Sequence, residues 1–147
     1  MPEYRKKGPE SEILMKTLIL ITDLINNKVL FEGPGESEPA PTGGIRLIFS
    51  SEIEEGRWML GRKGALLDNR AQLHTRALIR PNKTSRMEVF SEYGEMEIPL
   101  DHVCYTLEKN QAEIAYTLEG QRFSFRAQYE TGLNEDEQER SDEHGGN

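Results

Sequence analysis

The chain contains one cysteine, one tryptophan and three histidines. A single thiol, Cys104, excludes an internal disulfide and a cysteine-based metal cluster, and we expect it to pack as a small strand residue. The three histidines are too scattered for a set of metal ligands, so we expect neither a metal nor a cofactor. No run approaches the roughly 20 apolar residues of a membrane helix, because Lys16 and Thr17 interrupt the best one.

The sequence also lacks the signatures of common catalytic sites. There is no HExxH, GxSxG, CxxC or P-loop. His102 and Cys104 are two residues apart on a predicted strand, and about 7 Å is too far for a nucleophile and its base. We therefore expect a non-enzymatic protein. No small-residue cleavage site follows the apolar run at 13–21, which predicts a cytoplasmic location.

Both ends of the chain are polar, and its formal net charge is −8. Residues 130–147 carry seven acids and one arginine, which is typical of a disordered acidic tail. Residues 1–12 are also polar, which predicts a flexible N-terminus. We expect one β-barrel domain over residues 13–129.

Apolar residues recur with a period of two from residue 44 onward. Ile114, Tyr116 and Leu118 alternate with polar neighbours, as in a strand with one buried face. Similar alternation predicts strands at 45–50, 71–80, 103–108 and 122–129, with further strands at 16–25, 28–32, 57–61 and 65–67. Residues 33–44, rich in Pro and Gly, are predicted to form a loop. Short connections such as Asn26-Asn27 and Glu119-Gly120 predict tight hairpins.

These patterns favour a single all-β fold with no helix of normal length. Eight to nine short strands at close spacing indicate a sandwich or a barrel. Sequential hairpins favour the barrel, because closure removes exposed strand edges. We therefore predict an antiparallel meander barrel of about eight strands.

A series of short motifs carries a family resemblance. Arg62-Lys63-Gly64, His74-Thr75, the run 93–99 (YGEMEIP) and the run 114–121 (IAYTLEGQ) follow one another in this order. In order and spacing they resemble the YwiB-like family of bacterial proteins, and the resemblance covers roughly residues 16–129. It implies a calycin-like (lipocalin-like) barrel and a ligand-binding role, but no activity, because the family is uncharacterised. The interval from Glu52 to Arg62 is short for the family, so an incompletely closed barrel is an alternative expectation.

Positive charge is concentrated in one segment of this acidic chain. Residues 57–86 hold eight Lys or Arg and a single acid, Asp68. Alternation puts His74, Arg76 and Arg80 on one strand face, with Arg86 across the following turn. Arg presents a forked set of donors suited to carboxylate or phosphate, so the candidate ligand-binding residues are Arg62, His74, Arg76, Arg80 and Arg86. The alternative is a solvated outer face in which Arg76 pairs with acids such as Glu88.

Three functional hypotheses follow. The first is binding of a small, anionic molecule in the barrel, where small inward residues such as Ala77 and Ala112 either leave space or offset aromatic side chains in a filled core. The second is nucleic-acid binding by the basic segment, disfavoured because Trp58 is its one aromatic and the net charge is negative. The third is protein interaction: the acidic tail could fold back on the basic hairpin, or an open edge could make a homodimer.

Overall fold

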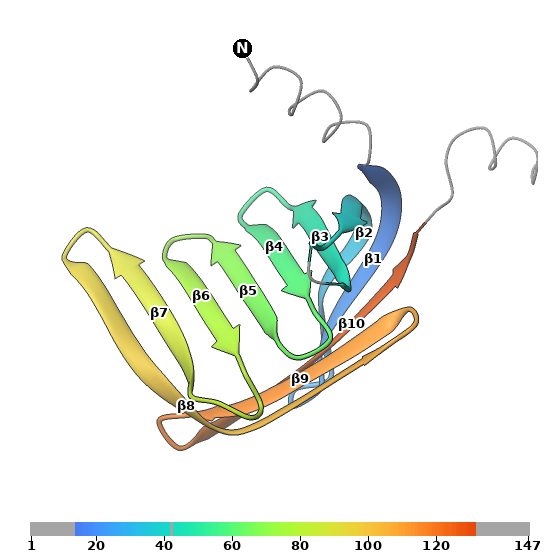
Figure 1. Ribbon diagram of the computed structural model, residues 1–147. Helices are drawn as coiled ribbons and strands as arrows, with labels where there is room; N and C mark the ends of the chain where they lie inside the picture. Colours follow the sequence, from blue (N-terminus) through green and yellow to red (C-terminus); the bar gives the residue numbers. More distant parts are fainter. Residues whose placement is uncertain (1–13, 42, 132–147) are drawn as a thin grey trace, which may run out of the picture.

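The computed structural model describes residues 14–41 and 43–131. In this part of the chain, ten strands form a closed antiparallel barrel with neighbours in chain order (Figure 1). The strands are β1 (Met15–Asp23), β2 (Lys28–Pro39), β3 (Ile45–Ser50), β4 (Glu55–Leu60), β5 (Ala65–Arg70), β6 (His74–Ile79), β7 (Ser85–Ser91), β8 (Gly94–Glu108), β9 (Gln111–Leu118) and β10 (Gln121–Glu130). The predicted flexible N-terminus and nearly all of the predicted acidic tail lie outside the described residues. Within those ranges, no helix is long and apolar enough to cross a membrane.

The barrel closes where its first and last strands meet. β1 pairs with β10 from Leu18↔Glu130 to Asp23↔Phe125, while its other edge pairs with β2. An incompletely closed barrel is therefore the wrong expectation. The estimate of about eight strands is also wrong, since the structure has ten. The described strands consequently leave no open edge through which two copies could pair.

Much of the predicted 33–44 loop is strand. β2 continues through Gly33, Pro34 and Gly35 to Pro39, pairing first with β1 and then with β3. Gly35 lies where β2 passes between these partners: a Cβ there would be 2.6 Å from the carbonyl oxygen of Ile48 and 2.7 Å from Cδ1 of Ile19. The Pro and Gly content predicted a loop, but here glycine permits close approach of the backbones.

Two other strand boundaries differ from the prediction. Residues 71–73 form a bend, so β6 begins at His74 rather than at Ala71. The segments 94–99 and 103–108 belong to one strand, β8, whose register shifts between Asp101 and Cys104 and whose His102 has φ 51°. This irregularity redirects β8, and Figure 1 shows β9 and β10 crossing beneath the lower ends of β4–β6.

The inward side chains form one hydrophobic core. A chain of aromatic rings runs across the barrel interior, with centroids 5.0–6.3 Å apart, in the order Phe31, Phe49, Trp58, Phe125, Tyr116 and Phe123. Small inward residues such as Ala77, Ala112 and Ala127 are buried beside them. Large rings and small side chains therefore complement one another in the packed interior.

Candidate functional site

The outer wall formed by β4–β8 carries a row of charged residues. Direct register partners across the five strands are Arg57, Asp68, Arg76, Glu88 and Glu97. Their charges alternate until the last pair, in which Glu88 faces Glu97 directly. Opposite charges at facing positions stabilise a sheet, whereas like charges do the reverse. The pattern is that of a solvated outer face, the alternative raised for Arg76.

The acid Asp68 of this charged row has basic side chains around it. Asp68 lies beside three basic side chains: its carboxylate is within hydrogen-bond distance of His74 Nε2, at 2.9 Å, and lies 3.8 Å from Nε of Arg70 and 3.9 Å from Nε of Arg76. The His74 ring also stacks on Phe90, with centroids 4.8 Å apart. No three acids, histidines or cysteines in the described part of the chain are arranged to hold a metal ion.

Arg86 lies between the two acids at the β7–β8 end of the charged row. Its Nε lies 3.0 Å from Glu88 and 3.3 Å from Glu97, so one guanidinium bridges the two facing acids. Arg76 Nη1 is 3.8 Å from Glu88, and its buried Nε has no hydrogen-bond partner among the described residues. The hollow beside Arg76 is lined by Glu88, Glu95 and Glu97. Three carboxylates there repel an anion.

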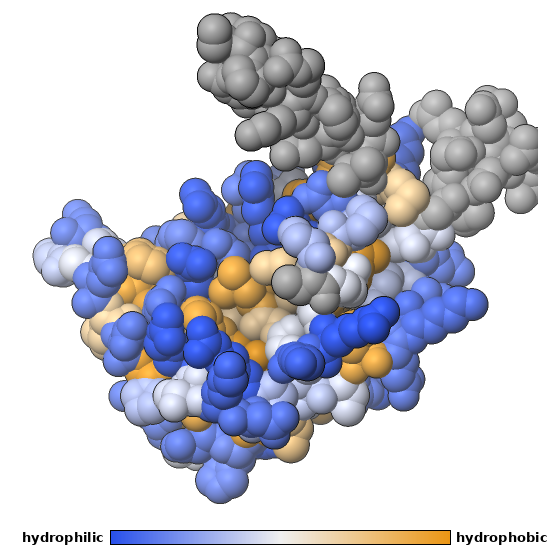
Figure 2. Space-filling view, viewed as in Figure 1, coloured by the Kyte–Doolittle hydropathy of each residue, from blue (hydrophilic) through white to orange (hydrophobic). Residues whose placement is uncertain are grey.

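A second row, next to the charged one, is mostly apolar. Met59, Leu66 and Leu78 face one another on β4, β5 and β6, with Arg46 and Arg86 at the two ends of the row. Figure 2 shows hydrophobic side chains gathered on this wall between hydrophilic ones. The three apolar side chains line a groove of about 240 Å³ together with Gly61, Gly64 and Arg80. We call it the outer groove.

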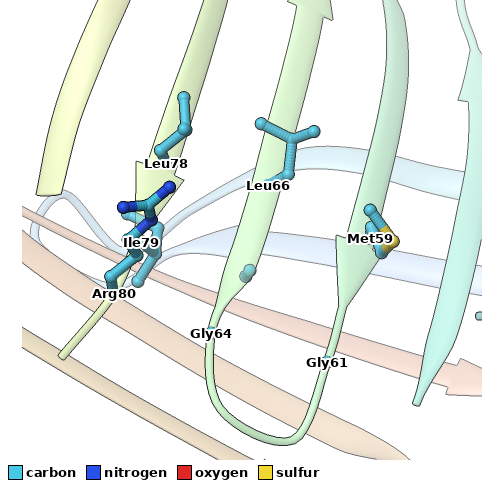
Figure 3. Close-up of a pocket in the computed structure, with 8 residues that line it drawn as sticks. Met59, Gly61, Gly64, Leu66, Leu78, Ile79 and Arg80 are labelled. Carbon is cyan, nitrogen blue, oxygen red and sulfur yellow. The ribbon is translucent and has the colours of Figure 1, made fainter. Parts of the chain in front are cut away.

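Two turns close one end of the outer groove. The β4–β5 turn contains Arg62 and Lys63 between Gly61 and Gly64, and the β6–β7 turn contains Arg80 and Lys83. All four cations are exposed, and none forms an ion pair with an acid in the described ranges. In Figure 3 the side chain of Arg80 extends back along β6 towards Leu78. We call these four cations the basic end.

The glycines of the β4–β5 turn allow close backbone approach beside the outer groove. Gly61 donates a backbone hydrogen bond of 2.9 Å to Gly64, which makes the turn tight. A Cβ on Gly64 would collide with the carbonyl oxygen of Ile79, so β5 and β6 approach closely only because this position is glycine. Figure 3 shows this turn below Met59 and Leu66.

The five predicted binding residues therefore fall into two groups. His74, Arg76 and Arg86 lie in or beside the charged row and contact Asp68, Glu88 and Glu97. Arg62 and Arg80 lie on the two turns of the basic end. Anion binding at either group stays a prediction.

Sequence reasoning missed the apolar part of the site. The one signal in the sequence is Leu78, an apolar residue on the polar face of its strand, between Arg76 and Arg80. A single leucine there is unremarkable, because isolated apolar residues are common on protein surfaces. Met59 and Leu66 join it only through the register of three strands.

Trp58, considered for nucleic-acid binding, points into the barrel. It is 4% exposed, and its Nε1 donates a 3.0 Å hydrogen bond to the side-chain oxygen of Asn69. The aromatic residue of the basic segment is thus unable to stack on an exposed base. This removes the feature that a nucleic-acid surface would need beside its positive charge.

Comparison with known proteins gives one structural relative. No protein-family model matches the chain, and no curated protein matches it either. The crystal structure of ywiB protein from Bacillus subtilis superimposes with a TM-score of 0.51 and 14% sequence identity, covering 81% of this chain and 90% of that one. At this identity the match establishes the fold alone. The resemblance seen in the sequence is thereby confirmed at the level of architecture: this chain has a YwiB-like β-barrel fold.

Proposed function

We propose that the chain is a non-enzymatic cytoplasmic protein that binds a small anion with an apolar portion, on the outer wall of its barrel. The observation that carries the proposal is the position of Arg80, which lines the outer groove with Leu66 and Leu78. An anionic headgroup bound by Arg80 lays its apolar portion over the two leucines. Arg62 and Lys63, on the neighbouring turn, add positive charge at the same end.

The chemistry of the basic end suits a carboxylate or a phosphate. Charge-assisted hydrogen bonds from a guanidinium to such oxygens are about twice as strong as neutral ones. The cations of the basic end have no acid partner in the described residues, so an anion does not have to displace an acid of the barrel itself. In the charged row the same ligand would compete with Asp68, Glu88 and Glu97.

The size of the outer groove limits the ligand. Its volume of about 240 Å³ lies below the roughly 300–1,000 Å³ of sites for drug-sized molecules. We therefore propose a medium-chain carboxylate or alkyl phosphate rather than a nucleotide.

A site inside the barrel has less support. The cavity lined by Phe31, Phe49 and Trp58 holds about 40 Å³, little more than the roughly 30 Å³ that one water occupies in the liquid. A ligand there would have to displace the aromatic rings.

Isothermal titration calorimetry with octanoate and octyl phosphate tests the proposal, with octylammonium as the opposite-charge control. We expect both anions to bind and each of Arg80→Ala and Leu78→Ser to weaken binding about five-fold or more. Arg57→Ala is the matched control, since Arg57 is exposed on the same wall and lies outside the outer groove. Absence of binding at millimolar concentration, or equal affinity for octylammonium, contradicts the proposal.

The same titration distinguishes the two groups of candidate cations. If Arg76→Ala weakens octyl phosphate binding and Arg80→Ala does not, the anion binds at the charged row.

We keep a homodimer as the alternative function. The observation that favours it is an exposed apolar pair on adjacent turns at the other end of β4 and β5, where Ile53 is 83% and Leu73 is 50% exposed. Sedimentation equilibrium of the protein and of Ile53→Ser tests it: a dimer that the substitution dissociates supports this alternative, and a monomer in both cases refutes it.

A further inference from the structure

The basic end carries four positive charges that the described barrel does not neutralise. Neither turn contains an acid. Between residues 60 and 84 the sequence has a single acid, Asp68 on β5, and it lies beside His74, Arg70 and Arg76. By contrast, Arg46, Arg86 and Arg126 on other strands of the barrel all lie within 3.5 Å of a carboxylate. Clustered like charges repel one another, so an acidic partner at this end is favourable.

We infer that this partner is an acidic segment of the same chain, residues 135–143, which docks on the basic end. Six of these nine residues are acidic: Glu135, Asp136, Glu137, Glu139, Asp142 and Glu143. The inference rests on the proposed function, because both assign a binding role to Arg62, Lys63, Arg80 and Lys83. It adds an occupant that competes with the ligand.

The geometry of β10 brings the acidic segment to the correct end of the barrel. In an up-and-down meander, β4, β6 and β10 run in the same direction, so their C-terminal ends lie at one end of the barrel. Tyr105 on β8 also lies between β10 and the β4–β5 turn. Its hydroxyl donates to the Gly61 carbonyl, and its pKa is raised first by burial and then by Tyr129 of β10.

The length of the chain after β10 sets how far the acidic segment reaches. The residues from 132 to 143 span at most roughly 40 Å when extended, at about 3.3 Å per residue. A short covalent tether typically gives an effective concentration in the millimolar range. Weak, exposed ion pairs can therefore add up to a populated docked state, which salt weakens by screening.

Docking and anion binding exclude one another at Arg80. An anion that enters the outer groove has to displace the acidic segment, which lowers its apparent affinity. A variant in which all six acids become Gln or Asn keeps the chain length and removes the competitor. We expect this variant, the neutral-tail variant, to bind octyl phosphate several-fold more tightly than the natural sequence.

Carbodiimide cross-linking of the full chain at low salt tests docking without any ligand. The reagent joins a lysine to a carboxylate in contact with it, and peptide mapping identifies the pair. We expect Lys63 and Lys83 to couple to acids within 135–143, and Lys28, an exposed lysine near the opposite end, to couple less. The cross-links should disappear at high salt and in the neutral-tail variant. A mixture of isotopically labelled and unlabelled protein should give links within one chain.

Several results overturn the inference: no link to Lys63 or Lys83, equal yields at Lys28, or links only to Lys6 and Lys7 of the N-terminal segment. Links found only between labelled and unlabelled chains also overturn it, because the acidic segment then binds a second copy. The two experiments distinguish failure of the ligand-binding proposal from failure of the docking inference. Cross-links without octyl phosphate binding refute the ligand proposal alone, and octyl phosphate binding without cross-links refutes docking alone.

Discussion

The hydroxyl of Tyr105 on β8 donates a 2.5 Å hydrogen bond to the carbonyl oxygen of Gly61, at the start of the β4–β5 turn. The two residues are 44 positions apart in the chain, and no strand pairing joins β4 to β8. This bond therefore connects opposite walls of the barrel. It also fixes the turn that carries Arg62 and Lys63.

Tyr105→Phe should destabilise the barrel by about 1–2 kcal/mol, because it leaves a carbonyl oxygen in a partly buried position without its donor. Urea unfolding followed by tryptophan fluorescence measures the change. Tyr93→Phe is the control, since Tyr93 is 91% exposed and should tolerate the loss of its hydroxyl. Equal effects of the two substitutions would show that the cross-barrel bond contributes nothing.

The barrel should lose stability in alkaline solution. Burial raises the pKa of Tyr116 from 10.0 to about 12 and raises the pKa values of Tyr105 and Tyr129 as well. The unfolded state releases these protons near pH 10 while the folded state retains them. Stability is thus fully present below pH 10 and falls as the pH rises through the folded-state pKa values, by about 3 kcal/mol for Tyr116 alone.

Thermal unfolding between pH 9 and pH 12 measures this dependence. Tyr116→Phe keeps the ring contact with Phe123 and should flatten the curve. An unchanged slope in Tyr116→Phe would show that Tyr116 is not among the groups responsible.

Gly35→Ala should destabilise the barrel substantially, although the substitution adds only one methyl group. The new methyl group would meet the Ile48 carbonyl and the Ile19 side chain at 2.6 and 2.7 Å, and a backbone atom cannot move aside as a flexible side chain can. Overpacking of this kind typically costs about 1–3 kcal/mol. Chemical denaturation measures it, with Glu36→Ala at the exposed neighbouring position as the control. A cost equal to that of Glu36→Ala would mean that β2 shifts without penalty.

Arg86→Ala should reveal repulsion between Glu88 and Glu97. These carboxylates face each other across β7 and β8, and the Arg86 guanidinium lies within 3.3 Å of both. Because all three side chains have some exposure, the expected loss is only about 0.5–1 kcal/mol. Adding Glu97→Gln to the Arg86→Ala variant should restore most of it. A double-mutant cycle in urea measures the coupling, and strictly additive effects would contradict the bridge.

The local pattern was sufficient for the last two strands of the barrel. β9 and β10 were predicted nearly to their ends, because regular alternation marks which face is buried and the Glu119-Gly120 pair takes the positive φ values of a tight hairpin. Pro and Gly misled the prediction at β2, because the sequence does not show whether glycine marks a turn or a close approach of two backbones.

For the candidate site, too, the local pattern predicts some features and not others. Composition and alternation identified the basic segment and placed His74, Arg76 and Arg80 on one strand face. They did not show that Arg76 faces Asp68 and Glu88, because facing partners depend on the register between strands far apart in sequence.

Residue patterns alone predict an all-β antiparallel meander with an unusual concentration of positive charge, since both are properties of neighbouring residues. The closure of ten strands, the inward position of Trp58, and the placement of Arg80 beside Met59, Leu66 and Leu78 follow from the folded barrel. Closure and side-chain neighbours depend on strand register, which is fixed by the packing of the whole core.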